Sequence, residues 1–108
     1  MSRPPRSPGR SWVLRSLAAD DLRAFTFRLL SGSEKTVGRV KGVDFVIDAP
    51  MVSRVHCRLT AQPGGRLEVL DLKSTNGTFV NGRRVTRAAL TVGDRLGVGR
   101  VELTVGQE

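Results

Sequence analysis

Apolar and polar residues alternate with a period of two in several short runs along the chain. In FTFRLL, which starts at Phe25, aromatic and aliphatic residues alternate with Thr26 and Arg28, and RLEVLD, which starts at Arg66, follows the same pattern. Such alternation places one face of a β-strand in a core and the other in solvent. The pattern therefore predicts an all-β protein whose strands each bury one face.

Ten runs are expected to be strands because they are rich in β-branched and aromatic residues and are bounded by Gly, Asp, Asn or Ser. They cover residues 12–17, 25–30, 36–39, 45–47, 55–61, 66–71, 78–80, 84–86, 95–98 and 101–105. Pro63-Gly64-Gly65 and Asn81-Gly82 are turn sequences that would connect neighbouring strands as hairpins. Strands at this spacing predict a β-sandwich.

Two stretches do not fit the strand pattern. Residues 17–24 contain good helix formers, but they span barely two helical turns and include Asp20-Asp21, so a loop or a single turn is favoured. Residues 1–10 combine prolines, Gly9, Ser and Arg without an apolar run, and they are expected to form a disordered basic tail. The predicted domain therefore covers residues 11–106.

The composition restricts the class of protein. A chain of 108 residues is long enough for one domain with its own core. No apolar run approaches the length of about 20 residues that crosses a bilayer, and the first dozen residues lack the apolar stretch of a secretory signal. Cys57 is the only cysteine, which excludes an internal disulfide and a multi-cysteine zinc site. We expect a cytoplasmic protein in a reducing compartment, with no cofactor, metal or membrane partner.

Three polar segments at the ends of predicted strands stand out from ordinary turns: residues 38–39, 53–56 and 71–78. Loops at one end of a sandwich can converge although they are distant in sequence. Together they would supply two guanidinium groups, two hydroxyls and a carboxamide, from Arg39, Arg54, Ser53, Thr75 and Asn76.

This set of side chains predicts an anion receptor, in keeping with the formal net charge of +8. A planar guanidinium matches two phosphate oxygens, and hydroxyls add donors without competing negative charge. Phosphate is therefore the natural ligand. The carboxamide of Asn76 both donates and accepts, so it suits the main chain of an extended peptide.

These segments resemble the forkhead-associated (FHA) domain family. The matching motifs are Gly38-Arg39, Ser53-x-x-His56 and the run STNGTFVNG from Ser74 to Gly82, in the order and spacing typical of the family. The resemblance covers roughly residues 12–105. It implies an eleven-strand sandwich of two sheets that binds phosphothreonine peptides through loops at one end, as a reader of phosphorylation and not as an enzyme.

The resemblance also implies roles for the residues in these motifs. Arg39 would form the main salt bridge to the phosphate, and Ser53 would donate a hydroxyl to it. Arg54 and Thr75 would complete the phosphate-binding group. Asn76 would hold the peptide backbone beside the phosphothreonine.

Three further motif residues, Gly38, His56 and Gly77, are expected to support the site without touching the ligand. Gly38 would permit a close approach of the chain before Arg39, and His56 would hydrogen-bond neighbouring loops into place. The uncharged stretch 49–52 suggests a preference for an apolar residue three positions after the phosphothreonine.

The resemblance implies a signalling adaptor downstream of Ser/Thr kinases, whose partner is a Thr-phosphorylated protein or peptide. The first 25 residues contain serines but no threonine, so the partner is expected to act in trans. Two other functions stay open. Arg83-Arg84 and Arg87 could bind nucleic acid, although no aromatic stacking platform accompanies them, and the domain could dock partners independently of phosphate. An enzyme is disfavoured because no nucleophile–base or carboxylate pair is recognisable.

Overall fold

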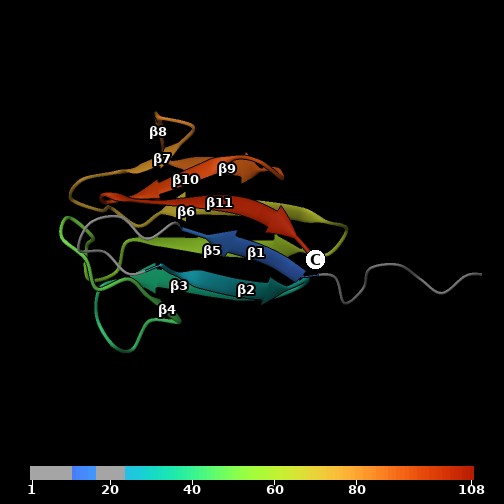
Figure 1. Cartoon of the computed structure of the whole chain (residues 1–108), viewed down its shortest axis with the longest axis horizontal. Coiled ribbons are helices and arrows are strands. Elements are labelled where there is room, and N and C mark those ends of the chain that lie inside the picture. Colours follow the sequence, from blue (N-terminus) through green and yellow to red (C-terminus); the bar gives the residue numbers. More distant parts are fainter. Residues whose placement is uncertain (1–10, 17–23) are drawn as a thin grey trace, which may run out of the picture.

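The computed structural model describes residues 11–16 and 24–108, in which eleven strands form two sheets and no helix is present (Figure 1). None of the described residues therefore forms a helix that could span a membrane. The strands are β1 (Ser11–Arg15), β2 (Thr26–Leu30), β3 (Glu34–Gly38), β4 (Phe45–Val46), β5 (Cys57–Gln62), β6 (Arg66–Asp71), β7 (Thr78–Val80), β8 (Arg83–Val85), β9 (Arg87–Leu90), β10 (Arg95–Val98) and β11 (Val101–Gln107).

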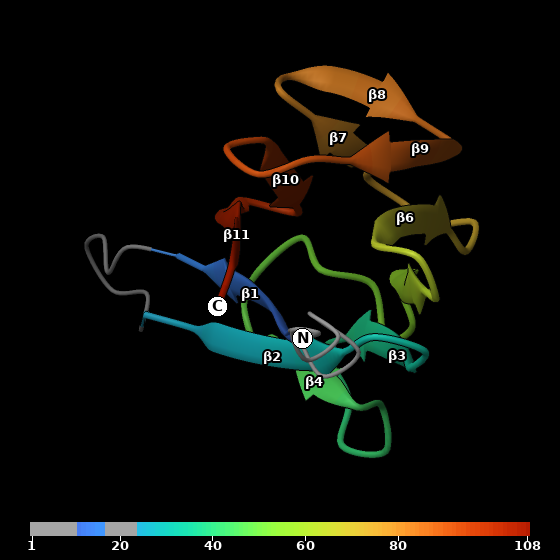
Figure 2. The ribbon, with the colours of Figure 1, turned by 90° about the vertical axis from the view of Figure 1, so that its right-hand side faces the viewer.

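The two sheets pack face to face, as Figure 2 shows with the layers seen from the side. The six-stranded sheet has the order β2-β1-β11-β10-β7-β8, and the five-stranded sheet has the order β4-β3-β5-β6-β9. All pairings between these strands are antiparallel except β3 with β4. The predicted β-sandwich of about eleven strands is confirmed.

One of the eleven strands, β9, was not among the ten runs predicted from the sequence. β9 has the sequence RAAL, which contains no β-branched or aromatic residue and has low intrinsic preference for a strand. It forms because it pairs with β6 and buries Leu90, which is 2% exposed. The expectations of a disordered tail at 1–10 and of a loop or turn at 17–24 concern segments that lie outside the described residues, apart from Ala24.

The core is built by strict alternation along the central strands. In β5, Cys57, Leu59 and Ala61 are fully buried and the residues between them are half-buried. Burial, followed by the nearby negative charge of Asp71, raises the pKa of the Cys57 thiol to about 12. Cys57 therefore packs as a small apolar residue, and Trp12, which is 5% exposed, anchors β1 in the same core.

Both predicted hairpin turns are confirmed. Asn81 and Gly82 connect β7 to β8 with φ angles of 52° and 82°, the left-handed conformation at both positions that a two-residue turn between twisted strands requires. Pro63-Gly64-Gly65 connects β5 to β6, whose register pairs Gln62 with Arg66.

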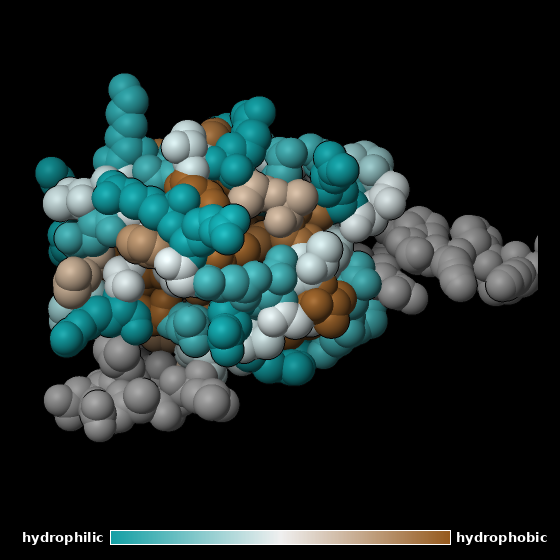
Figure 3. All heavy atoms as spheres, turned by 90° about the horizontal axis from the view of Figure 1, so that it is seen from above, coloured by the Kyte–Doolittle hydropathy of each residue, from teal (hydrophilic) through white to brown (hydrophobic). Residues whose placement is uncertain are grey.

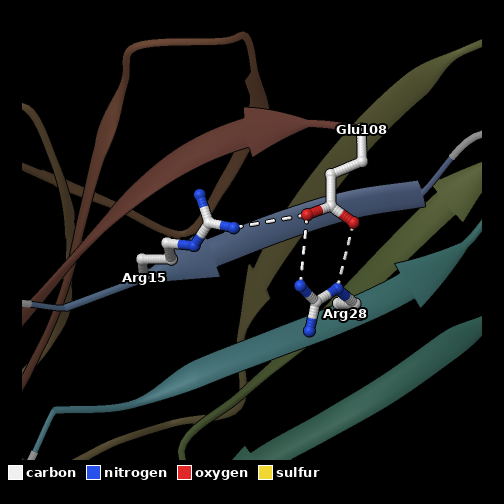
Figure 4. A network of polar contacts seen from close by, with 3 residues as sticks. All are labelled: Arg15, Arg28 and Glu108. Carbon is white, nitrogen blue, oxygen red and sulfur yellow. Dashed lines mark hydrogen bonds and ion pairs between the residues drawn. The ribbon is translucent and has the colours of Figure 1, made fainter.

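The ends of β1 and β11 are joined at the end of the sandwich that lies on the right in Figure 1. The Glu108 N–H donates to the Ser11 carbonyl oxygen over 3.0 Å. The Glu108 carboxylate accepts two hydrogen bonds of 3.1 Å from Arg28 and one of 3.3 Å from Arg15 (Figure 4). The hydrogen bond from Arg28 lowers the pKa of Glu108 below its usual value.

Candidate functional site

The loops β3–β4, β4–β5 and β6–β7 gather at the opposite end of the sandwich, on the left in Figure 1. They enclose an open cavity of about 560 Å³. Its lining carries three cationic side chains and no carboxylate, and consists of Arg39, Met51, Val52, Ser53, Arg54, Val55, Lys73, Thr75 and Asn76. All five residues that the sequence proposes for contact with phosphate or peptide therefore lie on one cavity.

Gly38 allows β3 to touch the β4–β5 loop directly. A Cβ atom on Gly38 would lie 2.0 Å from the Arg54 carbonyl oxygen, well inside van der Waals contact. The next residue uses this proximity, because the Arg39 N–H is shared between the carbonyl oxygens of Ser53 and Arg54 at 3.0 and 3.1 Å. These hydrogen bonds hold the end of β3 against the β4–β5 loop at Arg39.

The Arg39 side chain is oriented by the protein at only one of its nitrogens. Its Nε–H donates to the Val52 carbonyl oxygen over 3.0 Å. The terminal guanidinium nitrogens have no hydrogen-bond or ion-pair partner in the described part of the chain, so they are free to bind an oxyanion as a two-pronged donor.

Two side chains tie the β4–β5 loop to the β6–β7 loop. The Ser53 Oγ accepts a hydrogen bond of 3.0 Å from the Thr75 N–H, which leaves its hydroxyl proton available to a ligand. The Asn76 Nδ2 donates to the Met51 carbonyl oxygen over 3.1 Å. Asn76 keeps its carbonyl oxygen and a second N–H, the pair of groups that bind a peptide main chain.

His56 is fully buried beneath these loops and bridges them. Its Nδ1 accepts a hydrogen bond of 3.0 Å from the Ser53 N–H, so Nδ1 carries no proton. The proton therefore lies on Nε2, which donates to the Gly77 carbonyl oxygen over 2.9 Å. A neutral His56 thus holds the two loops at a fixed separation, and its side chain does not line the cavity.

Asp71 at the end of β6 fixes the start of the β6–β7 loop. Its carboxylate accepts hydrogen bonds from the Ser74 N–H, the Ser74 hydroxyl and the Thr78 hydroxyl. Burial alone would raise the pKa of Asp71, but these hydrogen bonds outweigh it and the pKa lies below its usual value. The Ser74 hydroxyl oxygen in turn accepts from the Gly77 N–H over 3.0 Å, which closes the turn.

Lys73 and Val55 line the cavity without having been assigned a role from the sequence, whereas Met51 belongs to the stretch 49–52 that the sequence analysis connects with an apolar preference. Met51 and Lys73 both have left-handed backbones, with φ of 71° and 59°. Lys73 adds a third cation to the cavity, and its place within the polar segment 71–78 was the available signal. Met51 and Val55 are 49% and 45% exposed and give the rim an apolar part.

Arg84 on β8 also approaches the site, which no sequence motif indicated. A Cβ atom on Gly77 would lie 2.8 Å from the Arg84 Nε, and the Gly77 φ of +94° is in the left-handed region. The left-handed conformation is the reason that this position favours glycine, because the exposed and flexible Arg84 side chain could move aside for a Cβ atom.

The fold and the site together define a class of binding module, namely a β-sandwich whose loops form a basic cavity at one end. The FHA domain model matches residues 35–99, more than half of the chain. The chain belongs to the FHA domain family.

Similar proteins are found both in bacteria and in animals such as Homo sapiens. An ABC transporter ATP-binding/permease protein of Mycobacterium tuberculosis is 45% identical over 67 residues, which are 62% of this chain and 8% of that protein. The FHA domain of the CT664 protein of Chlamydia trachomatis has a TM-score of 0.80 at 25% identity, covering 88% of this chain and 95% of that chain. EmbR of Mycobacterium tuberculosis, in complex with a low affinity phosphopeptide, has a TM-score of 0.75 at 26% identity, covering 88% of this chain and 24% of that chain. The chain thus spans a small part of the transporter and of EmbR.

Proposed function

We propose that the chain binds protein segments phosphorylated on threonine, through the cavity at the loop end of the sandwich. One observation carries the proposal: Arg39, Ser53 and Thr75, from three separate loops, meet on a cavity that has three cations and no carboxylate in its lining. A phosphate group brings about −1.5 to −2 charges and three acceptor oxygens, which such a lining satisfies.

In the proposed complex, the free guanidinium nitrogens of Arg39 bind two phosphate oxygens, and the Ser53 hydroxyl donates to the third. Arg54 and Thr75 complete the phosphate-binding group. Asn76 holds the peptide main chain through its side-chain carbonyl oxygen and its second N–H, because its other N–H donates to the Met51 carbonyl oxygen. An unmodified threonine lacks all of the charge that these residues are placed to bind, so phosphorylation acts as the switch for binding.

In this proposal the chain acts as an adaptor in signalling by Ser/Thr kinases. Its phosphorylated partner is a separate molecule, and the chain binds that partner without catalysing a reaction. The similarity to EmbR, which was solved with a phosphopeptide, supports the ligand class. The setting that we propose is the cytoplasm. A small site of this kind is expected to bind at micromolar concentration, about −8 kcal/mol, which suits a reversible signal.

The experiment is a calorimetric titration of one peptide in its threonine, phosphoserine and phosphothreonine forms. We expect measurable binding only for the phosphorylated forms, with phosphothreonine preferred over phosphoserine by about 1 kcal/mol or more, the size of one methyl contact. Arg39→Ala should abolish binding. Arg66→Ala is the matched control, because it removes an exposed cation at the far end of β6.

Equal affinity for all three peptides would contradict the proposal and favour a phosphate-independent docking domain. Binding to nucleic acid that weakens steeply with salt and survives Arg39→Ala would favour a nucleic-acid-binding module.

A further inference from the structure

A second cavity lies outside the loop site and shares no lining residue with it. Its volume is about 430 Å³, and it is lined by Val80, Asn81, Arg83, Val85 and Ala88. These residues come from β7, the following turn, β8 and β9, the group of strands at the top of Figure 2. Three of the five are aliphatic, so the cavity presents an apolar floor.

The cavity exists because one sheet is wider than the other by a strand. At the opposite side of the sandwich, β2 faces β4 through the rings of Phe27 and Phe45, whose centroids are 4.6 Å apart. The strand in excess is therefore β8, at the other end of the wider sheet. The five-stranded sheet ends at β9 and offers no further strand to cover the inner face of β8.

Along the inner face of the β7–β8 hairpin, the residues become less buried toward the edge of the sheet. Thr78 pairs with Val85 and Val80 pairs with Arg83, so all four project from the same face of the β7–β8 hairpin. Thr78 is fully buried, whereas Val80 and Val85 are only half-buried. Ala88 on β9 is half-buried beside them. Figure 3 looks onto this end of the molecule and shows hydrophobic residues exposed between hydrophilic ones.

β9 is an edge strand whose hydrogen-bonding groups on one side face no other strand among those described. A strand added beside β9 would extend the five-stranded sheet by one place. Because side chains alternate along a strand, every second residue of the added strand would point toward Val80 and Val85. A single added strand would therefore both pair with the free edge of β9 and fill the apolar cavity. We call this unoccupied position beside β9 the vacancy.

The rim of this vacancy is positively charged. Arg83 lines the cavity and Arg87 lies on β9. Both are exposed, and neither forms an ion pair within the described part of the chain. Arg84 does not belong to this rim, because it projects from the opposite face of the hairpin, toward Gly77. Asp94, whose carboxylate accepts hydrogen bonds from Asn81 and Thr91, adds one negative charge beside the rim, so the two arginines still leave the rim net positive. A partner strand with acidic residues would complement this charge.

We propose that β9 and the cavity beside it form a second binding site, which takes an extended acidic peptide with aliphatic side chains at alternate positions. A second copy of this chain fits less well, because a symmetric pairing would bring the same arginines of both copies together. Nucleic acid fits less well because no aromatic side chain lines the cavity. The site is independent of the phosphate cavity.

The experiment uses the whole chain, labelled with ¹⁵N, and a blocked peptide of alternating glutamate and valine. This probe contains no serine or threonine, so it offers nothing to phosphorylate. We expect saturable shifts of the amides of residues 79–90 and none in residues 39–54. The double variant Arg83→Glu/Arg87→Glu should weaken binding by about tenfold or more, because rim charge is reversed, while Arg66→Glu should leave it unchanged.

The variants also separate this site from the phosphate cavity. Arg83→Glu/Arg87→Glu should bind the phosphothreonine peptide within about twofold of the original chain, and Arg39→Ala should bind the glutamate–valine peptide normally. Ala88→Asp places a charge on the cavity floor and should abolish peptide binding while the circular dichroism spectrum stays unchanged.

Four results would each overturn the proposal. These are the absence of saturable shifts, equal binding of a lysine–valine peptide, preferential binding of an oligothymidine of equal length at the same residues, and a concentration-dependent dimer that Arg83→Glu/Arg87→Glu abolishes.

Discussion

Gly38 is the residue whose lack of a Cβ atom lets the loops around the cavity come together. Its absent Cβ leaves room for the Arg54 carbonyl oxygen, and the Arg39 N–H depends on that approach. The contact is between two backbones, so no flexible side chain can move aside to relieve a clash.

Gly38→Ala is therefore predicted to separate β3 from the β4–β5 loop. We expect a loss of stability of about 2–4 kcal/mol by chemical denaturation, in the range of strained core substitutions, together with loss of phosphopeptide binding. Gly42→Ala is the control for a nearby glycine. Gly42 has φ of +118° but no atom within 4 Å of a Cβ, so it carries backbone strain without a clash and should keep binding.

Met51 is the residue that we expect to contact the peptide beyond the phosphothreonine. It is 49% exposed on the cavity rim, and its φ of 71° limits which residues can replace it. Met51→Asn removes the apolar side chain and keeps the backbone, because Asn tolerates the left-handed region.

With Met51→Asn, we predict that a phosphothreonine peptide with leucine at the third position after the phosphothreonine binds about three- to tenfold more weakly, from the lost apolar contact. The same peptide with glycine at that position should bind nearly as before. Fluorescence anisotropy of the two labelled peptides measures the difference, and an equal loss for both would show that Met51 does not read this position.

At the residue scale, the sequence was sufficient to predict that Arg39, Ser53 and Asn76 lie on one cavity, because their motifs combine polar residues with obligatory turns. It was not sufficient for Arg84, because its place over Gly77 depends on the pairing of β8 with β7. Which residues of two paired strands come into contact depends on the register of the pairing. The spacing of motifs along the sequence does not reveal that register.

The β6–β7 loop is the element of the site with the most internal hydrogen bonds, and they converge on the Asp71 carboxylate. Since the pKa of Asp71 in the folded chain lies below its usual value, the ionised carboxylate stabilises the folded state. That contribution is complete above the unfolded-state pKa of about 4 and is lost as the pH falls through the folded-state pKa.

Asp71→Asn is predicted to lower the free energy of unfolding by about 1–3 kcal/mol at pH 7, because hydrogen bonds to a charged acceptor are lost. The difference between the two proteins should shrink as the pH falls below about 4, where the original carboxyl group also becomes protonated. Urea denaturation at several pH values measures it. Asp48→Asn, at an exposed position, is the control and should show no such trend.

At the element scale, the strand pattern of the sequence predicted ten of the eleven strands and both hairpin turns. β9 was missed because its strand conformation comes from pairing with β6 and not from its own residues. The boundary between β8 and β9 was equally hidden, since the chain changes sheets at the single residue Thr86.

The whole molecule should unfold as one unit, because Trp12 on β1 and Leu90 on β9 belong to the same buried cluster. Trp12 is the only tryptophan, so its fluorescence reports the state of the core. We expect its thermal transition to coincide with that seen by far-ultraviolet circular dichroism, as two-state unfolding requires.

A phosphothreonine peptide at a free concentration of one hundred times its Kd is predicted to raise the Tm by about 10 °C, since the binding adds about 2.7 kcal/mol to the stability of a chain of this size. Arg39→Ala should remove the increase while keeping the cooperative transition. An increase of equal size with the unphosphorylated peptide would contradict the proposed dependence on phosphate.

The meeting of Ser11 with Glu108, at the end of the sandwich away from the loops, has an architectural consequence. Polypeptide attached before the first strand or after the last one would leave from the same small region of the surface, on the side remote from the loop cavity. The domain can therefore be inserted into, or appended to, an unrelated protein without obstructing its own binding pocket. A geometry of this kind allows the same domain to be joined to proteins of different architecture.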